Sequence, residues 1–381
     1  MANILNYLQW RGDLPLEQVP FCDVDALVMS RLAYIPFDGI VPEQFSKQPV
    51  TLKTAAEICL ALAHDKDSTR EFHMREDEAF LKALIDSPRF ASLNLTGFVN
   101  RFNEQVQEQF SAITILLPNE EIYVSFRGTD GTLIGWKEDF NMGYAEVVPA
   151  QLDAVAYITE ASTHFPGNLR IGGHSKGGNL AVYAAAFCPK QIQDRIIAIR
   201  NHDGPGFDEK TIATDGYRQV MNRMKTYLPQ SSVVGMLLEH EEDFSIIHST
   251  NLGLMQHDVY SWEVVRNGFC QLQGRTNSSQ FIDATLKDWT RNMSREQREK
   301  MVDGLFSIVQ ASSGTTLRDL WNGKNTVAVI KAFAEMDDST RELLKEAYRI
   351  LQKSMKKALP IMLEQWWGKT PLLIKLLHTE S

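Results

Sequence analysis

The hydrophobic pattern changes along the chain, and the part from 111 to about 265 alternates between strand-like and helix-like segments. The run AITILLPNEEIYVSFRG predicts a hairpin of two strands joined by a Pro-Asn turn. Helical spacing follows from 152 to 159, and Pro166-Gly167 ends that helix. Then come the strand-like NLRIGG, the helical GGNLAVYAAAF, the strand-like RIIAIRNH, a helical stretch up to Met224 and the strand-like SSVVGMLL. Because parallel strands need long, usually helical crossovers, this order predicts an α/β core with a predominantly parallel sheet.

The segments on either side of this core are helical in pattern. Residues 1 to about 110 combine helical spacing with prolines and carry no obvious chemistry. Beyond about 265 the strand signals end. We therefore expect a core of residues 1–265 with a helical N-terminal segment, followed by an all-helical C-terminal extension of residues 266–381. The extension is a candidate cap, interaction region or homo-oligomer surface.

Two capping boxes mark helix starts in the extension, Ser294-Arg-Glu-Gln297 and Ser339-Thr-Arg-Glu342. After the second box, apolar residues recur three or four positions apart and predict a single buried stripe, with a helix end or kink at Pro360. The stripe consists of Leu344, Ala347, Tyr348, Leu351, Met355 and Leu359.

The composition limits which classes of protein and which kinds of partner are compatible with the sequence. A hydrophobic content of 44% is sufficient for a large core, and a net charge of -9 disfavours a nucleic-acid partner. The four cysteines form no Cys-x-x-Cys pair, as expected of reduced cytosolic thiols rather than a disulfide framework or zinc site. The first residues lack a secretory signal pattern, and no apolar run reaches the ~18 residues of a membrane span. We expect a cytoplasmic protein without a transmembrane segment.

The stretch RIGGHSKGGNLA places Ser175 between glycines where a predicted strand meets a predicted helix. Gly173-His-Ser-Lys-Gly177 is a Gly-x-Ser-x-Gly sequence in the context of a nucleophile elbow. An abrupt strand-to-helix turn forces strained backbone angles on the serine and requires small neighbours. It also places the Lys176 N–H and the positive end of the helix beside the serine, where an oxyanion can form.

A nucleophilic serine needs a base, which in this type of fold usually follows it along the chain. His257 lies in a loop-like stretch after the last predicted core strand, where a base is expected. His202, at the end of the strand that follows the elbow, is the alternative. His174 abuts the serine, but neighbouring side chains diverge at a sharp turn, so we expect it to pack beside the sheet.

The base in turn needs an orienting acid. Asp203 emerges at the end of RIIAIRNH, at the sheet edge that presents Ser175, although aspartate before Gly-Pro is also a common turn residue. Asp243, in the acidic run 239–243, is the alternative acid. The spacing of that run matches no calcium loop, so we expect no metal and no cofactor.

Several segments resemble known lipase sequences. Tyr123–Thr129 followed by Trp136 and Asp139-Phe140, together with the elbow and the stretch from His257 to Trp262, resembles the class 3 lipases. The segments GHSKGGNLA, NHDGPGF, LPQSSVVGMLLEHEEDFSIIHS and QHDVYSW together resemble the Mbeg1-like family more closely. The resemblance covers roughly residues 20 to 265 and implies an α/β-hydrolase fold.

The resemblance also implies roles for individual residues. Ser175 matches the nucleophile, His257 the base, and Thr129 the residue that completes the oxyanion hole with the Lys176 N–H. Lys176 departs from the usual leucine and introduces a cation near the nucleophile. The segment that carries the acid in class 3 lipases reads Ser231-Ser-Val-Val-Gly235 here, which transfers the role of acid to Asp203.

Together these features predict a serine hydrolase of the esterase or lipase kind that cleaves a small or lipid-like acyl ester through an acyl-enzyme. The sequence leaves thioesterase and peptidase activity open. A different class of function also stays open, a non-catalytic binding or scaffolding module that acts through the helical C-terminal region.

Overall fold

A computed structural model describes residues 1–65, 72–103, 108–129, 147–232, 234–236, 238, 240–274, 276–294, 296–298, 300, 301, 304 and 337–367. The described residues up to Leu272 form one compact unit, and those from Gln273 onward form a second. No helix among the described residues has the length and apolar character needed to cross a membrane.

The first unit is built on an eight-stranded mixed sheet whose strands lie side by side in the order of the sequence. The first four strands pair antiparallel, whereas β4 to β8 pair parallel. The strands are β1 (Val50–Thr51), β2 (Asn94–Asn103), β3 (Glu108–Leu116), β4 (Ile122–Phe126), β5 (Leu169–His174), β6 (Ile196–His202), β7 (Met224–Pro229) and β8 (Phe244–Ile247). A separate two-stranded ribbon pairs β9 (Val264–Val265) with β10 (Gly268–Phe269).

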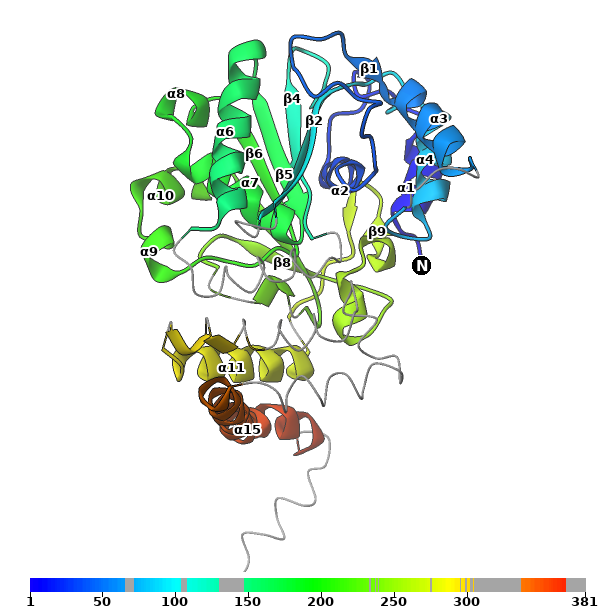
Figure 1. The fold of residues 1–381 in the computed structure, drawn as a ribbon. Helices are drawn as coiled ribbons and strands as arrows, with labels where there is room; N and C mark the ends of the chain where they lie inside the picture. The colour runs from blue at the N-terminus through cyan, green and yellow to red at the C-terminus, as the bar shows by residue number, and fades with distance from the viewer. Residues whose placement is uncertain are drawn as a thin grey trace, which may run out of the picture. The chain divides into compact units, whose positions relative to one another are not determined.

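Helices pack on both faces of the sheet (Figure 1). One face carries α6 (Pro149–His164) and α7 (Lys176–Phe187), with α10 (Asp215–Met221) packed on α7. The opposite face carries α2 (Asp23–Leu32), which contacts β4, β5 and β6. The remaining elements of this unit are α1 (Ile4–Arg11), α3 (Leu52–Ala63), α4 (Asp77–Ile85), α8 (Lys190–Gln193), α9 (Glu209–Ile212) and the 3-10 helices η1 (Val234–Met236), η2 (Gly253–His257) and η3 (Val259–Ser261).

The structure confirms the predicted hairpin and the mixed α/β class. β3 and β4 pair antiparallel across the predicted Pro-Asn turn, and the strands before and after the elbow helix are β5 and β6. The N-terminal part was predicted to be helical, yet it contributes β1 and the whole of the long strand β2. β2 runs antiparallel beside β3, the next strand along the chain, and this pairing stabilises a strand that its own sequence does not mark clearly.

The prediction that SSVVGMLL forms a strand is wrong. That segment contains a turn and the 3-10 helix η1, while the strands are β7 before it and β8 after it. The chain turns here because the Ser232 hydroxyl accepts a hydrogen bond from the Gly235 N–H at 3.1 Å. Such a local side-chain hydrogen bond competes with strand pairing.

In the second unit, α11 (Asn277–Arg291) packs against α15 (Asp338–Trp367), and the Trp289 indole donates to the Ala347 carbonyl at 2.8 Å. The capping box at Ser294 and Gln297 is present. The helix predicted to open at Ser339 begins at Asp338 instead, because Asp337 caps the Thr340 N–H at 2.9 Å.

The predicted stripe of α15 is only partly buried. Ala347 is 4% exposed, but Tyr348, Met355 and Leu359 are 60%, 44% and 44% exposed. The helix also continues through Pro360, so the predicted end at that residue is wrong. Pro360 is exposed, and the carbonyl that loses its partner there can bind water.

Candidate active site

Ser175 occupies a sharp turn between β5 and α7. Its backbone angles, φ 59° and ψ -137°, lie in a region that residues other than glycine seldom adopt. A Cβ at Gly173 would lie 2.3 Å from the Gly177 carbonyl carbon, and a Cβ at Gly177 would lie 2.1 Å from the Phe126 oxygen. Both flanking positions therefore require glycine if the turn is to close this tightly against β4.

The segment that contains Thr129 lies against this turn. Gly128 is so close to Ser175 that a Cβ at residue 128 would lie 2.7 Å from the serine Cβ. Thr129 follows directly and is half-buried. Trp136, Asp139 and Phe140, which contribute to the lipase resemblance, lie outside the described residues.

Lys176 begins α7 directly after Ser175, with its side chain buried. Its ammonium group donates to the Gln109 carbonyl of β3 at 3.0 Å. The cation expected near the nucleophile is thus held by the antiparallel part of the sheet.

Asp203 lies beside Ser175 at the carboxyl edge of the sheet. The residues before them, His174 and His202, are paired across β5 and β6, and the Ser175 N–H donates to the His202 carbonyl at 2.9 Å. Asp203 is fully buried and has a positive φ of 56°, which a non-glycine residue seldom adopts.

The structure brings Asp203 and His257 together. His257 Nδ1 lies 2.7 Å from Asp203 Oδ2, and the other carboxylate oxygen accepts a hydrogen bond from the Ser232 hydroxyl. Gly235 closes this site from the same loop, because a Cβ there would lie 2.3 Å from Asp203 Oδ1. Ser232 lies in the segment 231–235, at the place where class 3 lipases carry the acid. This segment therefore supplies a hydroxyl donor to Asp203 and not the acid itself.

The alternative base and acid are placed elsewhere. His202 is fully buried behind the edge, with Nδ1 3.1 Å from the Ser30 hydroxyl of α2. Burial, with a smaller contribution from the Arg200 charge, lowers the pKa of His202 to about 3. Asp243 is exposed at the start of β8, and the described contacts of His257 do not include it.

His174 contacts the loop of His257, which sequence reasoning did not predict. The two imidazole rings are 4.4 Å apart between centroids, and His174 Nε2 lies 2.8 Å from the His257 carbonyl. Because a carbonyl only accepts, Nε2 carries the proton of this hydrogen bond. Burial, reinforced by the neighbouring His257, lowers the pKa of His174 well below its usual range. His174 is thus a neutral donor that fixes the backbone at His257.

Tyr34, which follows α2, holds the other side of His174. Its hydroxyl lies 3.1 Å from His174 Nδ1 and 3.0 Å from the His174 carbonyl, and it accepts a hydrogen bond from the Gly128 N–H at 3.0 Å. One hydroxyl therefore links the segment that leads to Thr129 with the residue before Ser175.

A buried ion pair supports both Tyr34 and the histidine loop. Arg31 donates to Asp77 through Nε at 2.8 Å and through Nη2 at 2.6 Å. The Tyr260 hydroxyl, three residues after His257, donates to Asp77 Oδ1 at 2.8 Å, and the Arg31 guanidinium stacks 4.7 Å from the centre of the Tyr34 ring. The pair is almost free of solvent, so its removal would leave buried charge unpaired.

The two buried, neutral histidines predict a loss of stability in mild acid. Histidine in the unfolded chain titrates near pH 6.5, so below that pH the unfolded state binds protons that folded His174 and His202 do not. Each histidine then removes up to about 1.4 kcal/mol of unfolding free energy per pH unit as pH falls. Urea denaturation at pH 7.5, 6.5 and 5.5 measures this effect.

His202→Gln provides the control for that experiment, since glutamine does not titrate. We expect a flatter dependence of unfolding free energy on pH in this variant. Equal slopes for wild type and variant between pH 6.5 and 5.5 would show that His202 is not the group responsible.

The geometry defines a mixed α/β protein with a serine on a strained strand-to-helix turn and a carboxylate–imidazole pair at the same sheet edge, an arrangement typical of lipase-like proteins. The chain belongs to the Mbeg1-like family, whose model matches residues 84–307. No curated protein matches the chain.

Lipases are among the solved structures that match. The native Rhizomucor miehei lipase propeptide complex is 14% identical, with a TM-score of 0.35, over 68% of this chain and 96% of that one. A deletion mutant of the same complex is 13% identical, with a TM-score of 0.34, over 63% and 91%. M37 lipase is 14% identical, with a TM-score of 0.33, over 55% and 68%.

Proposed function

We propose that this protein is a serine hydrolase with an α/β-hydrolase fold that cleaves carboxylic esters. Ser175 is the nucleophile, His257 the general base and Asp203 the acid that orients the base. The observation that carries the proposal is the hydrogen bond from His257 Nδ1 to Asp203 at the sheet edge where Ser175 adopts a positive φ. Membership in a lipase-like family supports the same chemistry.

The hydrogen bonds of Asp203 set the proton positions that this reaction needs. Asp203 accepts from the Ser232 hydroxyl on one oxygen and faces His257 Nδ1 with the other. With its proton on Nδ1, neutral His257 has a free lone pair on Nε2, which is the atom that accepts the proton of Ser175.

The reaction then proceeds in two acyl-transfer steps. Ser175 Oγ attacks the ester carbonyl while His257 takes its proton, and the resulting oxyanion is stabilised by the N–H groups of Lys176 and Thr129. His257 next protonates the departing alcohol, which leaves an acyl group on Ser175. Water activated by His257 attacks this ester, releases the carboxylic acid and restores the serine.

His174 and Tyr34 support this cycle without taking part in proton transfer. His174 stays neutral and holds the His257 carbonyl, so the base keeps its position as it alternates between imidazole and imidazolium. We further propose that the C-terminal extension expected at residues 266–381, whose helices follow β10, serves as a cap or interaction region.

The proposal predicts that a fluorophosphonate probe labels Ser175. The probe reacts with activated serines, so mass spectrometry of the labelled protein should locate the adduct on the peptide that contains residue 175, and Ser175→Ala should abolish it. Ser162→Ala is the matched control, because Ser162 is also buried but its hydroxyl bonds to the Ile158 carbonyl of its own helix.

Cleavage of p-nitrophenyl esters from acetate to palmitate then gives the acyl length that the site accepts. A protein that neither reacts with the probe nor cleaves any of these esters would refute the proposed hydrolase function.

A further inference from the structure

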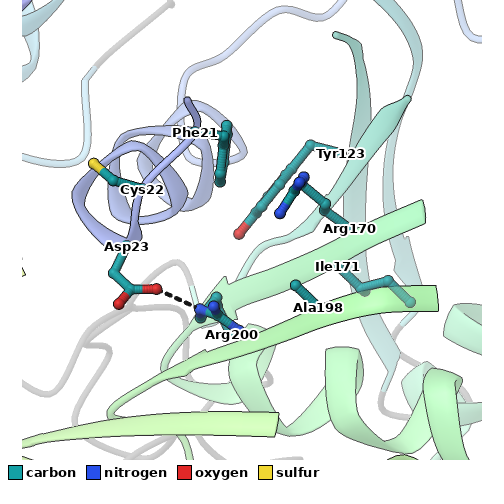
Figure 2. Close-up of a pocket in the computed structure, with 8 residues that line it drawn as sticks. All are labelled: Phe21, Cys22, Asp23, Tyr123, Arg170, Ile171, Ala198 and Arg200. Atoms are coloured by element: carbon teal, nitrogen blue, oxygen red, sulfur yellow. Dashed lines mark hydrogen bonds and ion pairs between the residues drawn. The ribbon is translucent and has the colours of Figure 1, made fainter. Parts of the chain in front are cut away.

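A small cavity lies between the start of α2 and strands β4 to β6, apart from the proposed active site. Arg170 in its wall precedes Ser175 by five residues of extended chain, a separation of about 16 Å. Figure 2 shows the lining: the α2 side consists of Phe21, Cys22 and Asp23, and the strands supply Tyr123, Arg170, Ile171, Ala198 and Arg200.

Two guanidinium groups from neighbouring parallel strands line this cavity. Arg170 donates through Nε to Glu121 at 2.8 Å, and Arg200 donates through Nε to Asp23 at 2.7 Å and through Nη1 to the Ile199 carbonyl at 3.1 Å. Among the described residues, no acceptor bonds to either terminal nitrogen of Arg170 or to Nη2 of Arg200. The side chains are 22% and 21% exposed, so these donors are accessible to a small ligand.

The charges around the cavity do not balance. Arg170, Arg200 and Lys225 contribute three positive charges, whereas Glu121 and Asp23 contribute two negative ones. Burial opposes ionisation of Asp23, but Arg200 and Lys225 outweigh it and lower the pKa of that carboxyl to about 2. One positive charge is left over near neutral pH, in a chain whose net charge is -9.

Small residues leave room between the two guanidinium groups. Ala198 is the β-pair partner of Arg170 and lies two positions before Arg200, so its methyl group forms the floor between them. Beside it, Gly172 admits the Tyr123 hydroxyl, which would lie 2.1 Å from a Cβ at residue 172. Phe21, two residues before the start of α2, covers the cavity, with the Arg170 guanidinium 5.0 Å from the centre of its ring.

We propose that this cavity binds a small carboxylate between Arg170 and Arg200. Guanidinium N–H groups match the two oxygens of a carboxylate in geometry and charge. A single negative charge also neutralises the one positive charge in excess, whereas a phosphate dianion would leave a negative charge in its place. The proposal does not depend on the hydrolase function.

Titration of the full chain with sodium acetate tests this site, with sodium chloride used to hold ionic strength constant. We expect saturable binding by isothermal titration calorimetry and a rise in melting temperature that chloride does not reproduce. Arg170→Gln or Arg200→Gln should weaken binding at least about tenfold, because each removes a charge-assisted donor. Arg101→Gln is the control, since Arg101 is 58% exposed and pairs with Asp153 outside the cavity.

A second variant tests the site with both arginines in place, in case the arginine variants do not fold. Ala198→Leu keeps both guanidinium groups and fills the floor between them, so it should abolish acetate binding while its circular dichroism spectrum and cooperative thermal unfolding match those of wild type. Equal affinity of acetate for Ala198→Leu and for wild type would overturn the proposal. So would acetate binding to wild type that does not saturate. Tighter binding of inorganic phosphate than of acetate would overturn the carboxylate assignment.

Discussion

On the proposed mechanism, His257→Ala is expected to lower kcat for p-nitrophenyl esters by about a million-fold, as does loss of the base in a well-studied serine protease. Without the imidazole, no group takes the proton of Ser175, and the alcohol leaves unprotonated. Labelling by the fluorophosphonate probe should fall in parallel, because it needs the same activated oxygen.

His248→Ala is the matched control for that variant. His248 is 26% exposed, close to the 25% of His257, and lies 2.8 Å from the Glu263 carboxylate. We expect its kcat to stay within about threefold of wild type, as for a surface ion pair. Comparable losses in the two variants would mean that His257 acts through the fold of its loop rather than as the base.

Asp203→Asn should lower kcat by about ten-thousandfold while the fold is retained. In the variant the Ser232 hydroxyl still donates to the side-chain oxygen, so the amide nitrogen faces His257 Nδ1 and donates to it. Neutral His257 must then carry its proton on Nε2, where it can no longer accept the proton of Ser175. The loss should appear in kcat.

Asp243→Asn tests whether Asp203 or Asp243 is the acid that orients His257. Asp243 is exposed, and Asp203 contacts His257, so the asparagine variant at residue 243 should keep its activity. Ester-hydrolysis rates measured side by side for the two variants make the comparison. A larger loss at residue 243 than at residue 203 would rule out Asp203 as the acid.

The sequence predicted the parts of the site that depend on short stretches of chain. The elbow is local, because the glycines at 173 and 177 and the change from strand to helix all lie within a few residues of Ser175. The position of Asp203 followed from parallel pairing, which aligns the ends of β5 and β6. The error over residues 231–238 arose because an apolar run predicts a strand unless a turn interrupts it, and the turn at Ser232 is stabilised by a side-chain hydrogen bond.

Contacts between distant parts of the chain could not be predicted in this way. Tyr34 reaches His174 across 140 residues, and Tyr260 reaches Asp77 across 183. No pattern in the sequence links such pairs, since Tyr34 lies in no recognisable motif and the segment QHDVYSW, which contains Tyr260, carries no signal of a contact with Asp77. The structure adds these groups, which connect the N-terminal helices to a site formed much later in the chain.

The order of the strands has a consequence for synthesis of the protein. Strands β4 to β7 lie in the sheet in the same order as in the sequence. The helices between them that contact the sheet, α6 and α7, therefore pack on one face. The other face is covered by α2 from the N-terminal segment. α2 leaves the ribosome before these strands, but its docking surface on the main sheet is incomplete until β6 has emerged about 170 residues later. The N-terminal segment therefore remains undocked during most of translation, and a nascent chain stalled before residue 196 would expose its apolar side to chaperones.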